Sequence, residues 1–149
     1  MTEKMIQMKQ NNESILEATI LVLEDMDNLR AQMVKDLRII GLKGKIVEAA
    51  NLQGAIGLVK SEKIAFIVSD WNLPDGTGMD LLKKLRATPY YENTPFVMCT
   101  TKSEISSVLE AVQNGANDYI VKPWTTDELK KKIFSTWENY QKNFKFKPA

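Results

Sequence analysis

Polar side chains that could do chemistry follow four short apolar segments of this sequence. Glu24 and Asp25 follow TILVL, Asp70 ends IAFIVSD, Thr100 ends FVMCT, and Lys122 follows YIV. A carboxylate can attack phosphorus when a divalent cation and an ammonium group neutralise the phosphoryl oxygens, and a hydroxyl can donate to one of those oxygens. These residue types therefore permit phosphoryl chemistry, provided that the fold brings the ends of the four segments together.

Three carboxylates gathered at one place need a compensating charge. Each pair of like charges about 4 Å apart costs roughly 4 kcal/mol at an effective dielectric constant of 20. A magnesium ion would compensate them, because it is a hard cation that takes oxygen ligands from one or two carboxylates, water and a phosphate. Asp25, Asp70 and a backbone carbonyl near Asn72 are the predicted ligands.

The elements that must position these residues alternate along the chain. Apolar runs predict strands at residues 19–23, 45–49, 64–70, 96–99 and 119–121. Each run is followed by a segment with apolar residues at every third or fourth position, which is typical of a helix packed on one face. The fourth helix is expected to begin with Ser103 as its cap, and the last with Thr125 or Thr126. The stretch 71–78, with its proline and glycines, is predicted to be loop only.

This alternation predicts the class of fold. Strands and helices that alternate with short connections form an α/β fold, in which helices cover both faces of a parallel sheet and crossovers are right-handed. Sites in such open sheets form outside the carboxyl ends of the strands, where the direction of winding reverses. Because the polar residues described above all lie at strand ends, we expect them to form one site.

Composition excludes several classes of function. The chain has 149 residues, enough for one domain, with a net charge of +1, a single cysteine and no histidine. Direct nucleic-acid binding is not expected at this charge, and the lack of histidine removes Ser-His, Cys-His and imidazole-metal sites. With no signal peptide or membrane span predicted, the chain is expected to be cytoplasmic. We expect a flexible or partly helical extension over residues 1–17, a domain over 18–142 and a tail over 143–149.

Four segments in order carry a resemblance to a known family. The acidic pair in LVLED, the loop SDWNLPDGTG, the strand end MCT and the segment NGANDYIVKPW each match a motif of the receiver domain of two-component response regulators. Over residues 19–140 the sequence resembles that family, and most of all its stand-alone chemotaxis (CheY) type. The resemblance implies a flavodoxin-like (βα)5 fold, a doubly wound parallel sheet in strand order 2-1-3-4-5 within a three-layer α/β/α arrangement.

The resemblance also implies how the acidic residues act. Asp70 would accept a phosphoryl group from a partner histidine kinase. Asp25, Asp70 and the Asn72 carbonyl would hold magnesium, and Glu24 would contribute through a water molecule. The chain would be a signalling switch with at most slow autodephosphorylation, and not a classical enzyme.

The remaining residues of the pattern would respond to the phosphoryl group by changing position or contacts. Lys122 would pair with it, Thr100 would move toward it, and Tyr119 would turn inward. A cis peptide bond is expected before Pro123. A downstream protein target would then bind the surface made by the fourth helix, the fifth strand and the fifth helix.

The sequence departs from the usual family pattern in two places. Glu24 stands where an aspartate is most common. Thr101 follows Thr100 where the family usually has a small residue, and Lys102 comes next, so we expect the lifetime of the phosphorylated state to be tuned in this chain.

Two alternatives stay open from the residues alone. One is a small magnesium-dependent phosphotransferase or phosphatase, although Asn72 stands where one such family keeps an aspartate. The other is a receiver-like binding module that is not phosphorylated.

Overall fold

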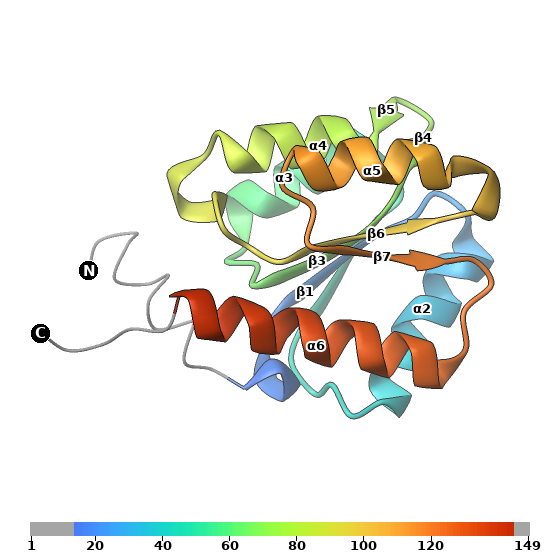
Figure 1. Cartoon of the computed structure of the whole chain (residues 1–149), viewed down its shortest axis with the longest axis vertical. Helices are drawn as coiled ribbons and strands as arrows, with labels where there is room; N and C mark the ends of the chain where they lie inside the picture. The colour runs from blue at the N-terminus through green and yellow to red at the C-terminus, as the bar shows by residue number, and fades with distance from the viewer. Residues whose placement is uncertain (1–13, 145–149) are drawn as a thin grey trace, which may run out of the picture.

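Five parallel strands form the central sheet of the computed structural model, which describes residues 14–144. They are β1 (Ile20–Leu23), β2 (Ile46–Ala49), β3 (Phe66–Asp70), β6 (Phe96–Thr100) and β7 (Asp118–Val121). Their order in the sheet is β2-β1-β3-β6-β7, which is the predicted order 2-1-3-4-5 when only these strands are counted. Figure 1 labels β1, β3, β6 and β7 of this sheet. The direction of winding therefore reverses between β1 and β3, and the carboxyl ends of these two neighbours define the site.

Two layers of helices enclose the sheet. The helices are α2 (Asp27–Ile39), α3 (Leu52–Ser61), α4 (Gly78–Arg86), α5 (Ile105–Gln113) and α6 (Thr126–Phe144). Figure 1 shows α3, α4 and α5 on one face and α2 and α6 on the other, so the predicted α/β/α layering is confirmed. Short 3-10 turns lie at Ile15–Glu17 (η1), Pro89–Tyr91 (η2) and Lys102–Glu104 (η3).

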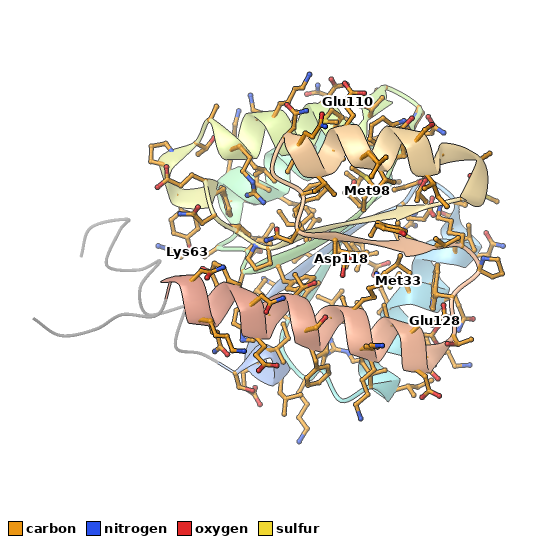
Figure 2. The ribbon with its side chains drawn as sticks, viewed as in Figure 1. Met33, Lys63, Met98, Glu110, Asp118 and Glu128 are labelled. Atoms are coloured by element: carbon orange, nitrogen blue, oxygen red, sulfur yellow. The ribbon has the colours of Figure 1, made fainter. Side chains whose placement is uncertain are left out.

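Alternation along the buried strands divides the core into two halves. On β1, Leu21 and Leu23 pack toward α3, α4 and α5, whereas Ile20 and Val22 pack toward α2 and α6. Met98 lies in the first of these halves, on the α5 side of the sheet (Figure 2). Each fully buried aliphatic side chain contributes about 1.5–3 kcal/mol by leaving water. The central strands are therefore apolar on both faces, and a charge is tolerated only where a strand ends.

The start of α5 differs from the prediction. Glu104, and not Ser103, is the N-cap residue, and no side chain caps this helix. The Ser103 hydroxyl is instead 2.9 Å from that of Thr101, within the η3 turn that precedes the helix. By contrast, the last helix is capped as predicted, since Thr125 Oγ1 accepts a hydrogen bond from the Glu128 N–H.

The stretch after Asp70 contains a short hairpin, so the prediction of loop alone was wrong. Strands β4 (Asn72–Leu73) and β5 (Gly76–Thr77) pair antiparallel across the turn between them. Asp75, in this turn, accepts hydrogen bonds from two backbone N–H groups at the start of α3, and these bonds lower its pKa. Two-residue strands are too short to show in hydrophobic periodicity, which explains why the pattern missed them.

The described chain begins with a turn that packs on the domain. The Ser14 side chain caps η1, Ile15 is buried, and the Leu16 carbonyl accepts hydrogen bonds from the backbone of Lys43 and Gly44. The rest of the expected N-terminal extension, residues 1–13, lies outside the described residues, as does the C-terminal segment 145–149. No helix in the described part of the chain is long and apolar enough to cross a membrane.

Candidate functional site

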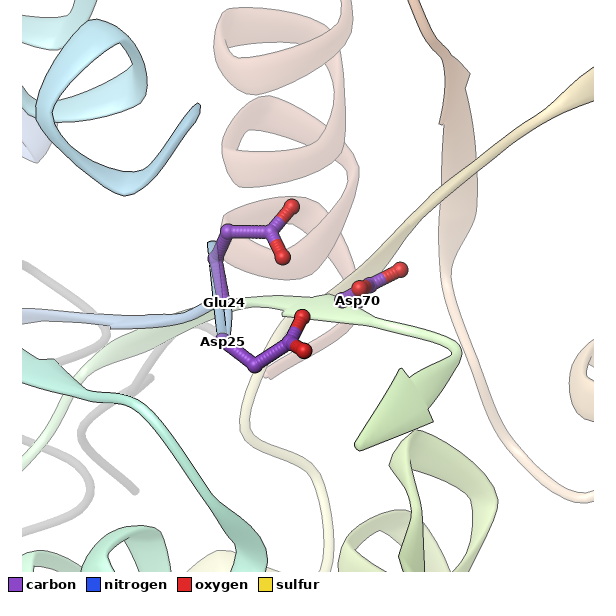
Figure 3. A group of neighbouring side chains, drawn as sticks. All are labelled: Glu24, Asp25 and Asp70. Atoms are coloured by element: carbon purple, nitrogen blue, oxygen red, sulfur yellow. The ribbon is translucent and has the colours of Figure 1, made fainter. Parts of the chain in front are cut away.

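The carboxylates predicted to act together do lie together. Because β1 and β3 are parallel neighbours with Leu23 opposite Ser69, the residues that end them emerge side by side. Figure 3 shows Glu24 and Asp25 at the end of β1 beside Asp70 at the end of β3. One carboxylate oxygen of each of the three residues lies within 4.8 Å of the others.

Lys122 reaches the same cluster from the end of β7. Its Nζ is 2.6 Å from Glu24 Oε1 and 3.0 Å from Asp70 Oδ1, and all three side chains are nearly buried. Burial by itself would lower the pKa of Lys122, but its hydrogen bonds to Glu24 and Asp70 outweigh that effect and the pKa is raised. In this arrangement the ammonium group that was expected to meet a phosphoryl group is held by two carboxylates.

The cluster fits a divalent cation. Glu24, Asp25 and Asp70 carry three negative charges when ionised, and Lys122 supplies one positive charge. The pKa of Asp25 is raised, mainly by partial desolvation and further by a hydrogen bond with Glu24 and repulsion from its carboxylate, although Lys122 acts to lower it. The donors are hard oxygen atoms on two adjacent strand ends, which is the donor set that Mg²⁺ prefers.

Asp70 is held so that one oxygen is occupied and the other is open. Its Oδ1 accepts a 2.8 Å hydrogen bond from the Trp71 N–H in addition to the contact with Lys122. No hydrogen bond to Oδ2 is present from the described residues, which makes Oδ2 the oxygen available to an electrophile. The backbone is fixed by Ser69, whose hydroxyl donates to the Asp70 carbonyl, and by Gly78, whose N–H donates to the Trp71 carbonyl.

Thr100 and Asn72 lie at the rim of the site, where both are bound to Glu104. The Thr100 side chain is fully buried, and its hydroxyl donates to Glu104 Oε2 over 2.8 Å. The Asn72 amide donates to Glu104 Oε1 over 2.6 Å. Glu104 was not predicted to lie at the site. An acidic residue near the start of a helix commonly stabilises the helix end, so its type and position alone do not indicate a site.

Tyr119 lies apart from the carboxylates. It is half-buried on β7, where it pairs with Met98, and Lys132 Nζ lies 4.7 Å from its ring centroid. Lys132 also forms a 3.0 Å ion pair with Asp118, which precedes Tyr119. The predicted switch residue is thus covered by a cation from α6 in this arrangement.

The segment after Lys122 is tied to α2. The peptide bond before Pro123 is cis, as predicted. The Trp124 Nε1–H donates to Asp36 Oδ2 over 2.8 Å, and Gln32 donates to Asp36 Oδ1, so each oxygen of this buried carboxylate accepts a hydrogen bond. A groove of about 500 Å³ opens here. It is lined by Leu29, Gln32, Asp36, Thr101, Lys122, Pro123 and Trp124.

An acidic cluster and a lysine at the carboxyl ends of a doubly wound five-stranded sheet define the class of protein. The family model of the response regulator receiver domain matches residues 20–134, and the chain belongs to this family. Among curated relatives, the chemotaxis protein CheY of Pseudomonas aeruginosa is 35% identical over 119 residues, which cover 80% of this chain and 95% of that protein.

Further relatives agree in sequence and in structure. Chemotaxis protein CheY-3 of Vibrio cholerae is 35% identical over 119 residues, covering 80% of this chain and 91% of the relative. The solved structure of the chemotaxis response regulator CheY4 of Vibrio cholerae superimposes with a TM-score of 0.73 at 27% identity, over 80% of this chain and 98% of that one. The chain is therefore a receiver domain of the CheY-like kind, a class of signalling switches.

Proposed function

We propose that this protein is a single-domain response regulator in which Asp70 accepts a phosphoryl group from the phosphohistidine of a partner kinase. The observation that carries the proposal is the joint placement of Asp70, two further carboxylates and Lys122, with Lys122 Nζ 3.0 Å from Asp70 Oδ1. Asp70 Oδ2 attacks phosphorus, the P–N bond to the histidine breaks with its electron pair staying on the imidazole nitrogen, and that nitrogen then takes a proton from solvent.

The chain's own residues prepare this transfer. Asp25, Asp70 and the carbonyl of Asn72 would hold Mg²⁺, with Glu24 acting through water. The cation would supply positive charge that screens the carboxylates from the incoming phosphoryl oxygens. Lys122 exchanges one of its carboxylate partners for a phosphoryl oxygen, and the Trp71 N–H keeps Asp70 oriented. The groove beside Lys122 supports an approach of the donor from the side of α2.

In the phosphorylated state, a protein target would bind the surface formed by α5, β7 and α6. β7 is an edge strand, and α5 exposes two large apolar side chains, Leu109 and Val112. Recruitment of Thr100 to the phosphoryl group and an inward turn of Tyr119 would reshape this surface, since only contacts that differ between two states can shift their populations. We further propose that this switch acts in the cytoplasm and does not bind nucleic acid directly, in keeping with its net charge of +1.

The test is intact-mass measurement of the pure protein after incubation with Mg²⁺ and acetyl phosphate. A single added phosphoryl group that is absent in Asp70→Asn supports the proposal. Turnover of many equivalents would instead support a phosphatase or phosphotransferase, and the absence of any adduct would support a binding module that takes no phosphate.

A further inference from the structure

Glu104 connects the ends of two neighbouring strands, β6 and β3, beside Asp70. Thr100 ends β6, and Asn72 follows β3 by two residues. Both donate to the same carboxylate, Thr100 over 2.8 Å and Asn72 over 2.6 Å. The other acceptor for the Thr100 hydroxyl, the Thr101 carbonyl, is more distant at 3.4 Å.

The local fold directs this carboxylate toward the site. The η3 turn closes with a 3.1 Å hydrogen bond from the Glu104 N–H to the Thr101 carbonyl, which turns residue 104 back toward the end of β6. As the N-cap residue, Glu104 is placed to accept a hydrogen bond from the first turn of α5, but no side chain caps this helix. The carboxylate binds Thr100 and Asn72 instead.

We propose that Glu104 is a latch that holds the unphosphorylated arrangement of this receiver, a proposal that rests on the function proposed above. A phosphoryl group brings about two negative charges and three acceptor oxygens. Thr100 has one hydroxyl proton, which it can give either to Glu104 or to a phosphoryl oxygen, but not to both. Recruitment of Thr100 to the phosphoryl group must therefore break the hydrogen bond between Thr100 and Glu104. Glu104 thus opposes both the phosphorylated state and the movement of Thr100 that follows it. Glu104 is a positioning residue, since it acts through Thr100.

The experiment measures the affinity of the full chain for fluoroberyllate, a phosphoryl mimic, in the presence of Mg²⁺ by intrinsic tryptophan fluorescence. Wild type is compared with Glu104→Gln, which preserves the shape of the side chain, and with Glu104→Ala. The matched control is Glu110→Gln, which removes a charge from the exposed outer face of the same helix (Figure 2). Glu104→Ala should bind about tenfold more tightly, the equivalent of one charge-assisted hydrogen bond. Glu104→Gln, which loses the charge but keeps one acceptor oxygen, should show a smaller gain, and the control should change less than twofold.

A second comparison tests whether the effect passes through Thr100. In a Thr100→Ala background, Glu104→Ala should no longer raise the affinity, because the bond that it breaks is already absent. An undiminished gain in that background would overturn the latch, as would equal affinities of wild type and both Glu104 variants. If wild type itself fails to bind fluoroberyllate, or binds it as well after Asp70→Asn, the proposed function fails, which is a separate outcome.

Discussion

Replacing Lys122 by methionine tests whether the acidic cluster is held together as the structure shows. The ammonium group lies 2.6 Å from Glu24 and 3.0 Å from Asp70, and 13%, 7% and 11% of the three side chains is exposed. Removing one partner of a buried ion pair costs about 3–5 kcal/mol, because the other charges stay buried without compensation. For a chain of this length the melting temperature should fall by roughly 10–15 °C in the absence of divalent cations.

The effect of pH on this variant has a definite sign. In wild type, Lys122 has a raised pKa, so its stabilisation is fully present below the ordinary value of 10.5 and is lost as pH rises through the higher folded-state value. In the variant, Asp25 loses the attraction of Lys122, which acts to lower its pKa in wild type, so this carboxylate binds a proton more readily in the folded than in the unfolded state. The deficit in the free energy of unfolding should therefore shrink as pH falls from 7 toward about 4.5.

Urea denaturation at several pH values, with and without Mg²⁺, measures the deficit. The matched control is Lys45→Met, because Lys45 forms an ion pair of similar length, 2.7 Å, with Glu62 in a more exposed place. That variant should lose at most about 1 kcal/mol. Mg²⁺ should restore part of the stability of the Lys122 variant but not of the Lys45 variant. Equal stability of the two variants at pH 7 without Mg²⁺ would refute the reasoning.

Further predictions concern the metal and the backbone at the site. Mg²⁺ should raise the melting temperature of wild type but not of Asp25→Asn, and its affinity should weaken as pH falls, starting above 3.8 because the pKa of Asp25 is raised; calorimetric titration at several pH values checks this. Gly78→Ala should destabilise the fold by about 1–3 kcal/mol in urea, since an added Cβ would overlap the Asp70 carbonyl and approach Met98. Gly57→Ala, with open space around it in α3, should instead stabilise by about 1 kcal/mol.

The sequence was enough to predict the sheet and most of the cluster, for a physical reason. Strands buried on both faces must be apolar, so the point at which each run ends in a polar residue also marks the edge of the sheet. Parallel order then brings those ends together, as it does for Asp25 and Asp70.

The sequence did not reveal which partner a polar side chain binds when several similar partners are within reach. Ser103 was a reasonable cap for α5, yet its hydroxyl lies beside Thr101, and Glu104 turns toward Thr100. Lys122 was assigned to a phosphoryl group, but in this structure it binds Glu24 and Asp70. Such alternatives differ by about the strength of one hydrogen bond, and no spacing rule distinguishes them.

The bond between Asp36 and Trp124 has a consequence for how this chain can evolve. The two residues are far apart in sequence, on α2 and just after Pro123, yet the indole N–H and the buried carboxylate satisfy each other. Changing Trp124 alone leaves one oxygen of the buried Asp36 carboxylate without this partner, at about 1–3 kcal/mol, and changing Asp36 alone leaves the half-buried indole N–H without it, whereas apolar residues of matching shape at both positions could be nearly neutral. Positions 36 and 124 should therefore be inherited as a pair, and a chimaera that takes its first half from one receiver and its second half from another will separate them.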